Sequence, residues 1–206
     1  MKEAWIYIFK NGDEGYKIGY TTGEVEKRFK ALSTGNPNLT TEKIVHFENN
    51  KIAKLVENII HSKFNNRHIK GNSSKEFFLV DLDEINIALE EATTLATELI
   101  VLDQNTEEYN NIEETTGKLL PASDEDEKLY AELLEIRQQL FDLEKQKEII
   151  ENKIKLRIKN NEGIDNMAVW SVQKRESLDT KKFKEENPEL VEKYKKVTIL
   201  RVLRIK

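Results

Sequence analysis

The apolar periodicity of the sequence breaks off between Asp103 and Asp126, and this break limits how the 206-residue chain can fold. The segment DQNTEEYNNIEETTGKLLPASDED is rich in Asn, Thr and Glu and contains both Gly and Pro. Such a segment buries too little apolar surface to offset the entropy lost on ordering, so we expect an acidic linker at residues 103–125. The chain should therefore form two separately built halves rather than one continuous core.

The predicted linker also carries most of the net charge of −5. Residues 103–123 contain one basic and five acidic residues, whereas residues 1–102 contain 13 and 15, and residues 124–206 contain 19 and 18. The acidity of the whole chain therefore does not argue against contact between the folded halves and phosphate groups.

Several classes of protein are excluded by what the sequence lacks. The chain has no cysteine, which excludes disulfides, thiolate zinc sites and cysteine nucleophiles. The N-terminal residues MKEAWIYIFK lack the apolar run of a signal peptide, and no segment approaches the roughly 18 apolar residues of a membrane span. We expect a soluble, cytoplasmic protein with no membrane partner.

The first half, residues 1–102, has the pattern of a small α/β (α+β) domain, a mixed sheet with flanking helices. Short runs rich in β-branched and aromatic residues predict strands, and apolar stripes at helical spacing predict helices. The first two strands should form a hairpin, because the intervening segment Asn11–Gly15 is rich in turn residues. We expect strands at 5–9, 16–20, 43–47 and 76–80, and helices at 24–32, at 50–65 with Asn50 as cap, and from Asp81 or Asp83 onward.

The second half should begin with a long amphipathic helix at residues 126–162. Its apolar residues follow the 4-3 spacing of a coiled coil for just under four heptads, with Lys147 as the single polar interruption. The seam consists of Leu129, Leu133, Ile136, Leu140, Leu143, Ile150 and Ile154. Two interpretations stay open: packing onto the chain's own C-terminal segment, or pairing through residues 129–154 in a homodimer or with an unidentified protein partner.

Residues 163–206 predict a small, basic α+β module. We expect a strand at 167–172, a helix at 180–186, a helix that begins at Pro188 and a closing strand at 197–205. Basic residues near an aromatic ring suit phosphate contact and base stacking, which makes this module a candidate DNA contact. The candidate residues are Trp170, Lys174, Arg175, Arg201 and Arg204. The alternative is that Trp170 is a core residue and that the basic residues pair with nearby acids.

The first half also contains side chains suited to phosphodiester cleavage. A carboxylate can bind Mg²⁺, the metal and a guanidinium can stabilise charge on the phosphate, and a phenol or amine can help to deprotonate water. The candidate catalytic residues are Tyr7, Lys17, Tyr20, Arg28, Glu57 and His61. Glu57 and His61 lie one helical turn apart and so share a helix face. Taken singly, a tyrosine in a strand is usually a packing residue, Arg28 is usually a solvated helix residue, and Glu57 is usually a surface charge.

The order of these residues is more specific than any one of them. In sequence the elements are Trp5-Ile6-Tyr7, Lys17-Ile18-Gly19-Tyr20-Thr21, Arg28, Glu57 with His61, Arg67, and Glu76-Phe77-Phe78. Over residues 3–80 this order resembles the GIY-YIG nuclease superfamily, in the branch known as the bacteriophage T-five Orf-type DNA-binding domain.

The resemblance implies roles for individual positions. Tyr7 matches the tyrosine of the first motif, and Lys17 stands at the tyrosine position of the second. Arg28 matches the catalytic arginine and contacts DNA together with Lys17 and Arg67, while Glu57 matches the ligand of a Mg²⁺ or Mn²⁺ ion. His61, Arg67 and Glu76 match further positions typical of this branch.

Two departures from the superfamily pattern bear on catalysis. Trp5 replaces the glycine of the first motif, and the second motif begins with lysine, which is usual in this branch. The general base is therefore left open between Lys17, Tyr7 and Tyr20. The resemblance implies a phage or mobile-element DNA-binding protein in a bacterial cell or phage-infected host, with metal-dependent endonuclease activity. The alternative is an inactive DNA-binding or protein-interaction factor with the same fold.

The tail has a second resemblance, over residues 130–206. Its elements in sequence are Val169–Arg175, Leu178–Lys181, Asn187–Leu190, Tyr194 and Arg201–Lys206. This order is similar to the C-terminal portion of YqaJ-like phage recombinase exonucleases. Their nuclease core is absent from this chain, so the resemblance implies only the accessory module.

Overall fold

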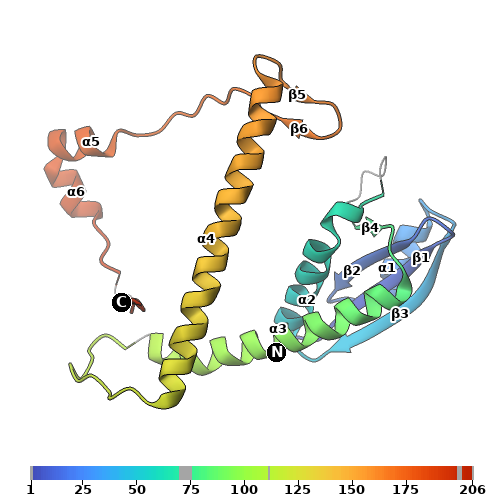
Figure 1. The fold of residues 1–206 in the computed structure, drawn as a ribbon, viewed down its shortest axis with the longest axis horizontal. Coiled ribbons are helices and arrows are strands. Elements are labelled where there is room, and N and C mark those ends of the chain that lie inside the picture. Colours follow the sequence, from blue (N-terminus) through green and yellow to red (C-terminus); the bar gives the residue numbers. More distant parts are fainter. Residues whose placement is uncertain (1, 70–75, 111, 199–200, 206) are drawn as a thin grey trace. The chain divides into compact units, whose positions relative to one another are not determined.

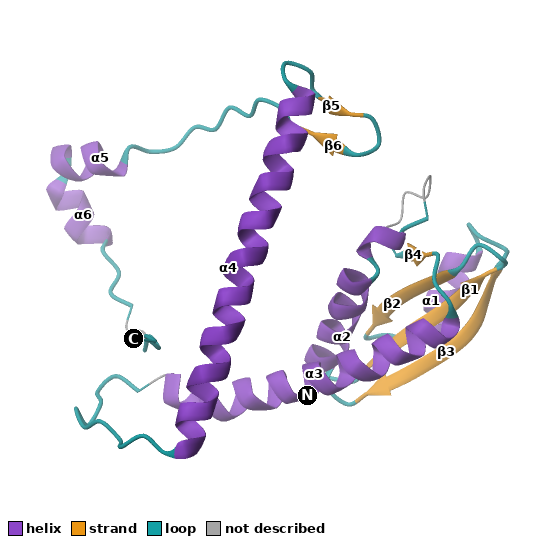
Figure 2. Ribbon diagram, viewed as in Figure 1, coloured by secondary structure: helices purple, strands orange, loops and turns teal. Residues whose placement is uncertain are grey.

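The computed structural model describes residues 2–69, 76–110, 112–198 and 201–205 and shows an α+β architecture (Figures 1 and 2). The chain divides into two compact units. The first contains Met1–Ile112 with Leu200–Lys206, and the second contains Glu113–Ile199. None of the helices in the described ranges is both long and apolar enough to cross a membrane.

The first unit is built on a four-stranded sheet in which every pairing is antiparallel. The strands are β1 (Ala4–Asn11), β2 (Tyr16–Thr21), β3 (Leu39–Phe47) and β4 (Phe77–Phe78), in the order β3-β1-β2-β4. The predicted hairpin is confirmed as β1 and β2. Its turn requires Gly15, which has a φ of 101° and would carry a Cβ only 2.2 Å from the carbonyl oxygen of Phe78.

Alternation along β1 gives the sheet two buried faces. Ile6 and Ile8 lie on the face covered by α2 and α3, whereas Tyr7 and Phe9 lie on the face covered by α1. The helices are α1 (Val25–Ser33), α2 (Asn50–Lys63) and α3 (Leu82–Asn110). The second face carries the candidate phenol and guanidinium, so it positions the site.

Several element boundaries differ from the sequence-based predictions. Asn49, not Asn50, caps α2, and its side chain accepts a hydrogen bond of 3.0 Å from the Lys51 amide. β3 begins four residues earlier than expected, at Leu39. β4 is only two residues long because it pairs with Tyr16 and Lys17, and beyond Tyr16 its partner strand has already entered the hairpin turn.

The expected linker start at Asp103 is too early, because α3 continues to Asn110. Residues 103–110 contain no Gly or Pro, and each residue added to an existing helix gains a hydrogen bond at little further cost. The boundary between the two units nevertheless lies inside the predicted segment, after Ile112.

The second unit is dominated by α4 (Asp124–Ile158), which confirms the predicted long helix. A capping box fixes its start: the Ser123 hydroxyl accepts from the Asp126 amide, and the Asp126 carboxylate accepts from the Ser123 amide. The remaining elements are β5 (Gly163–Ile164), β6 (Ala168–Val169), α5 (Thr180–Glu186) and α6 (Pro188–Tyr194). The two short helices were both predicted.

The closing strand predicted at 197–205 is not formed by the residues of that range that the structure describes, 197–198 and 201–205. The other two, 199 and 200, lie outside the described residues. A strand needs a neighbour to take up its backbone hydrogen bonds, and here the described residues supply none. The expected strand at 167–172 is likewise reduced to the two residues of β6, which pair with β5.

Candidate functional site

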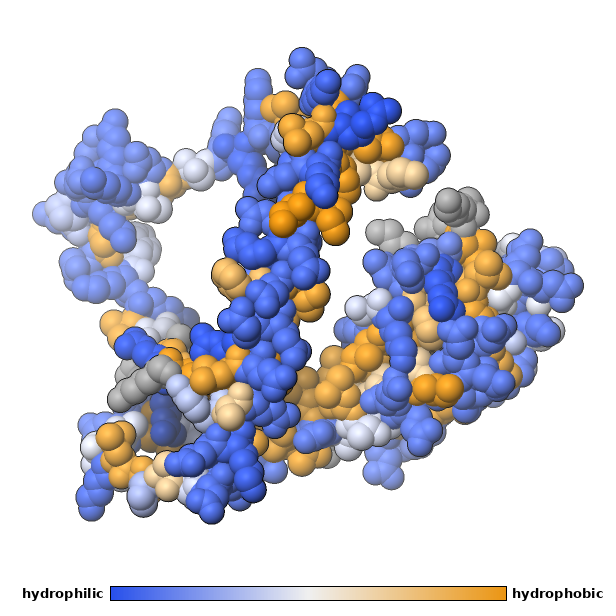
Figure 3. Space-filling model, viewed as in Figure 1, coloured by the Kyte–Doolittle hydropathy of each residue, from blue (hydrophilic) through white to orange (hydrophobic). Residues whose placement is uncertain are grey.

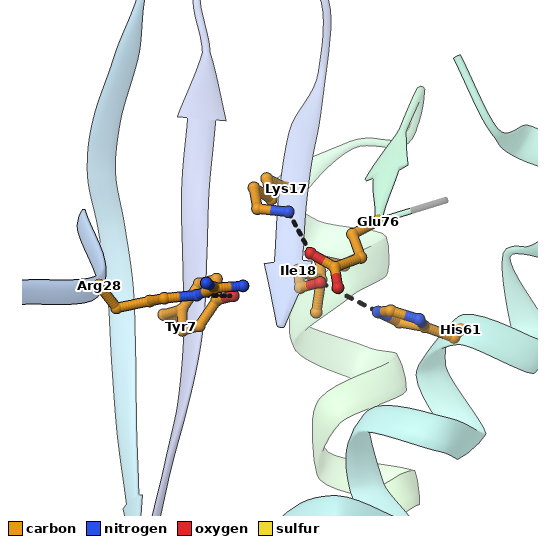
Figure 4. Close-up of polar contacts among 6 residues, drawn as sticks. All are labelled: Tyr7, Lys17, Ile18, Arg28, His61 and Glu76. Carbon is orange, nitrogen blue, oxygen red and sulfur yellow. Dashed lines mark hydrogen bonds and ion pairs between the residues drawn. The ribbon is translucent and has the colours of Figure 1, made fainter. Parts of the chain in front are cut away.

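The site centres on Tyr7, which β1 places on the α1 face with 1% of its surface exposed. Arg28, from α1, donates from Nε to the phenolic oxygen over 3.2 Å (Figure 4). The ring can lie across β2 because Gly19 stands opposite Tyr7, where a Cβ would come within 2.4 Å of the phenolic oxygen. A glycine of the second motif thus makes room for the tyrosine of the first.

Burial raises the pKa of Tyr7 above its ordinary value, although the hydrogen bond and charge of Arg28 act in the opposite direction. The hydrogen bond to Tyr7 in turn raises the pKa of Arg28. The phenol is therefore protonated at neutral pH, and since its oxygen accepts from Arg28, its own proton is directed elsewhere. The pair can present a phenol O–H and a guanidinium to one anionic group.

The Arg28 side chain is otherwise exposed. Nε uses one of its five N–H donors, and the described part of the chain offers no hydrogen-bond or ion-pair partner to the rest. Such a fork matches the oxygens of a phosphate group.

Lys17 is buried, whereas a residue that contacts phosphate at the surface would be exposed. It lies opposite Phe9 in the β1–β2 register, and its side chain is 2% exposed. The ammonium forms an ion pair with the carboxylate of Glu76 and lies 4.8 Å from the centroid of the Phe77 ring. Both partners come from the segment that enters β4, so the ion pair joins β4 to the second motif (Figure 4).

Glu57 is a buried carboxylate on α2, with a side chain that is 8% exposed. It forms an ion pair with Lys54, which is half-exposed. Burial is the main cause of the raised pKa of Tyr7, and the hydrogen bond to Tyr7 is the main cause of the raised pKa of Arg28. The charges of Glu76 and, to a smaller extent, Glu57 add to both. The carboxylate thus lies within electrostatic reach of the pair.

His61 lies one turn after Glu57 and supports β2 instead of contacting Tyr7 or Arg28. Its Nε2 is 3.0 Å from the carbonyl oxygen of Ile18 and donates to it (Figure 4). The Ile18 amide donates to the carbonyl of Glu76, so the ladder with β4 ends at this residue. His61 therefore supplies the next hydrogen bond that the strand edge needs.

Two predicted residues are not brought to this group. Tyr20 lies on the opposite face of β2 from Tyr7, with the Lys54 ammonium 5.3 Å from its ring centroid. Arg67 ends a short 3-10 helix and donates to the carboxylate of Glu84 on α3 over 2.5 Å.

The predicted DNA-contact residues of the tail lie on irregular segments. Trp170 is half-exposed, and its amide donates to the Glu162 carbonyl over 2.8 Å, so the alternative of a core tryptophan is wrong. Lys174, Arg175, Arg201 and Arg204 are all exposed.

Two partners were missing from the predicted catalytic set. Glu76 was singled out only as a family position, and its pairing with Lys17 spans 59 residues, which no local spacing reveals. Lys54 was missed although it precedes Glu57 by three residues on a helix, a spacing at which opposite charges meet.

The donor set fits one kind of divalent-cation site. No group of three His, Asp or Glu side chains suited to a metal occurs among the residues that the structure describes. Mg²⁺ is, however, commonly bound by one or two carboxylates, with water and substrate phosphates as its other ligands. The buried Glu57 carboxylate, whose cationic partner is half-exposed, suits a site that the substrate completes.

Comparison with known protein families gives a match in the first half of the chain. Residues 4–93 match the family model of the T5orf172 domain, which confirms the resemblance predicted for the first half. The match points to a phage-type domain of the DNA-binding, nuclease-like kind. No curated protein and no solved structure matches the chain. The resemblance of residues 130–206 to exonuclease tails stays a prediction.

Proposed function

We propose that the first unit hydrolyses DNA phosphodiester bonds with a Mg²⁺ or Mn²⁺ ion held by Glu57. The observation that carries this proposal is the Tyr7–Arg28 pair, with unpartnered guanidinium donors within electrostatic reach of a buried carboxylate. Paired phenol and guanidinium donors favour an oxyanion, and a nearby carboxylate favours the cation that such an oxyanion needs.

Each side chain has a distinct task in this scheme. Arg28 binds the scissile phosphate and stabilises the charge that develops on its oxygens. Tyr7 donates a hydrogen bond from its phenolic O–H to a non-bridging oxygen of the phosphate, and Gly19 leaves the space that its ring occupies. A cation held by Glu57 would polarise the phosphate as a Lewis acid and would lower the pKa of nearby water.

Lys17 and His61 are assigned structural tasks. The Lys17 ammonium is buried and donates to Glu76, so it has no lone pair with which to accept a proton. Its ion pair holds β4 beside the second motif, and His61 holds the adjoining edge of β2. Tyr20, on the other face, contacts α2 rather than the reacting phosphate.

Nicking of supercoiled plasmid in Mg²⁺ or Mn²⁺ tests the proposal. Arg28→Ala and Glu57→Gln should each lower the rate by about two orders of magnitude or more, because each removes a group that stabilises the transition state. Lys30→Ala and Glu26→Gln, two exposed substitutions on α1, are the matched controls and should retain it. Nicking that persists in Glu57→Gln, or in excess chelator, contradicts the metal-dependent scheme.

One observation favours a second candidate, a DNA-binding factor without turnover. The position of the second-motif tyrosine is filled by a lysine that the structure buries in an ion pair. In this case the wild-type chain binds duplex DNA with a steep salt dependence but does not cut it in either metal. Exposed Trp170, Lys174 and Arg175 serve as an additional DNA contact in both cases.

A further inference from the structure

The seam of α4, defined as the 4-3 positions from Leu129 to Ile154, is exposed apart from Leu133, which is half-buried. Figure 3 shows separate apolar side chains at intervals along an otherwise hydrophilic α4. Exposed fractions are 60% for Leu129, 54% for Leu140 and 58% for Ile150. An exposed apolar row of this length, interrupted only at Lys147, marks a surface that binds a partner.

The other helices of the second unit are too short to cover the seam. It spans residues 129–154, or about 38 Å of helix, whereas α5 and α6 have seven residues each, or about 10 Å. Ile158, the residue that follows the seam by four positions, is the only apolar side chain that the described part of this unit buries.

We propose that the seam pairs with α4 of a second copy of the chain in antiparallel orientation. All the seam positions find a counterpart when the two-fold axis of the helix pair passes between residues 141 and 142. Leu129 then faces Ile154 of the second copy, Leu133 faces Ile150, Ile136 faces Lys147, and Leu140 faces Leu143. Every seam residue has a counterpart in this register.

The polar interruption at Lys147 favours this orientation. In a parallel pair the two Lys147 ammonium groups face each other across the seam, and like charges repel. In the antiparallel pair each Lys147 faces Ile136, whose side chain its methylene stem can cover while the ammonium reaches water. The ammonium already lies 3.4 Å from the carboxylate of Glu151 on its own helix.

Charges on the flanks of the seam lead to the same orientation. In the antiparallel pair Arg137 faces Glu144 of the second copy, and Glu132 faces Lys153, each contact occurring twice by symmetry. In the parallel pair Glu132 meets Arg137, while Glu144 and Glu151 meet the neutral Gln139 and Gln146. The antiparallel arrangement therefore uses more of the charges that the helix carries.

Crosslinking of the full-length chain tests the orientation directly, because the natural sequence has no cysteine. Two variants, Ile136→Cys and Lys147→Cys, are purified separately, mixed and oxidised. The antiparallel pair brings positions 136 and 147 together, so we expect a heterodisulfide and little crosslinking of either variant alone. Positions 147 of the two copies then lie about 16 Å apart along the axis, beyond the roughly 7 Å that a disulfide spans.

Each outcome of the crosslinking experiment corresponds to a different arrangement of α4. Homodisulfides of each variant, without the heterodisulfide, overturn the orientation in favour of a parallel pair. A wild-type chain that sediments as a monomer at high concentration overturns the second copy as partner, and leaves the chain's own tail or another protein. Gln138→Cys, outside the seam, is the control: mixed with Lys147→Cys in place of Ile136→Cys, it should not form a heterodisulfide. None of these measurements depends on DNA cleavage.

Discussion

Tyr7 experiences two opposed influences whose balance can be measured. Burial favours the neutral phenol and Arg28 favours the phenolate; burial has the larger effect, so the pKa lies above its usual value of about 10. A raised folded-state pKa contributes stability below the unfolded value and loses it as pH rises through the folded value. Tyr7 therefore makes the first unit weaker in strong alkali.

We expect Tyr7→Phe to remove this alkaline loss. Thermal unfolding of the wild type and the variant between about pH 8 and pH 11 measures it, because lysines and other groups titrate alike in both chains. As pH rises past about 10, the melting temperature of the wild type should fall more steeply than that of Tyr7→Phe. A constant difference over the whole range contradicts the assignment.

The Lys17–Glu76 ion pair yields a second prediction at this scale. Glu76→Gln leaves a buried ammonium without its counter-charge, so the free energy of unfolding should fall by about 2 kcal/mol, less than for a fully buried pair because Glu76 is one-third exposed. Lys17→Met, which removes the charge but keeps the length, should cost less.

Urea unfolding of the full chain measures both changes. The control is Glu91→Gln, since Glu91 forms an ion pair with Lys63 in which both side chains are largely exposed, and its loss should stay within about 0.5 kcal/mol. Equal losses for Glu76→Gln and Glu91→Gln would falsify the claim that burial makes the first pair different.

These residues also show how far the sequence could lead. The order of Tyr7, Arg28 and Glu57 was sufficient to select them, and the family match covers all three. The burial of Lys17 could not be predicted, because it depends on a partner that reaches it only when β4 joins the edge of the sheet. Tyr20 lies on the other face of the sheet because successive side chains of a strand point to opposite faces. The order of motif residues carries no information about the face on which each one lies.

Among elements, helices were better predicted than strands for a physical reason. The signals for α2, α4 and α5 lie within the segments themselves, in caps and apolar stripes. A strand ends where its neighbour ends, so β4 stops with the hairpin turn beside it, and the segment expected as a closing strand lacks a partner in the described structure.

The proposed α4 pairing predicts a charge reversal with an orientation-dependent rescue. Arg137→Glu places two acids together in either orientation, since it meets Glu144 in the antiparallel pair and Glu132 in the parallel one. At about 0.5 kcal/mol for each of two symmetric contacts, the dimer dissociation constant should rise about fivefold or more. Adding Glu144→Arg restores the attraction only in the antiparallel pair.

Sedimentation equilibrium of the wild type, the single variant and the double variant measures these constants. The effect should shrink as salt is raised, because the flanking charges are exposed to solvent. A double variant that dimerises no better than Arg137→Glu alone is the result that contradicts the antiparallel register.

For the whole molecule, the important feature is the tether between the two units. The described residues 112–123 are exposed and form neither helix nor strand, and residues 103–123 carry most of the net negative charge. The acidic total thus describes the end of α3 and the tether rather than the surface at Arg28. Because α4 is about 50 Å long, an antiparallel pair attaches its two tethers at well-separated ends.

That separation predicts a dependence on DNA length. Two linked units that bind one long duplex gain avidity, whereas a duplex that accommodates only one unit does not benefit. Leu140→Glu combined with Leu143→Glu should break the pair and weaken binding to long duplex DNA by about 100-fold, with little change on the short duplex. Electrophoretic mobility shifts at constant salt measure both affinities.

The matched control adds the same charge away from the seam. Gln138→Glu with Asn152→Asp introduces two acids on the outer face of α4 and should leave both affinities close to those of the wild type. If the seam variant loses the same factor on short and long DNA, its added charge is repelling phosphate and avidity is not involved. Loss on long DNA alone, with nicking per unit retained on the short duplex, is what a dimer of independent DNA-binding units requires.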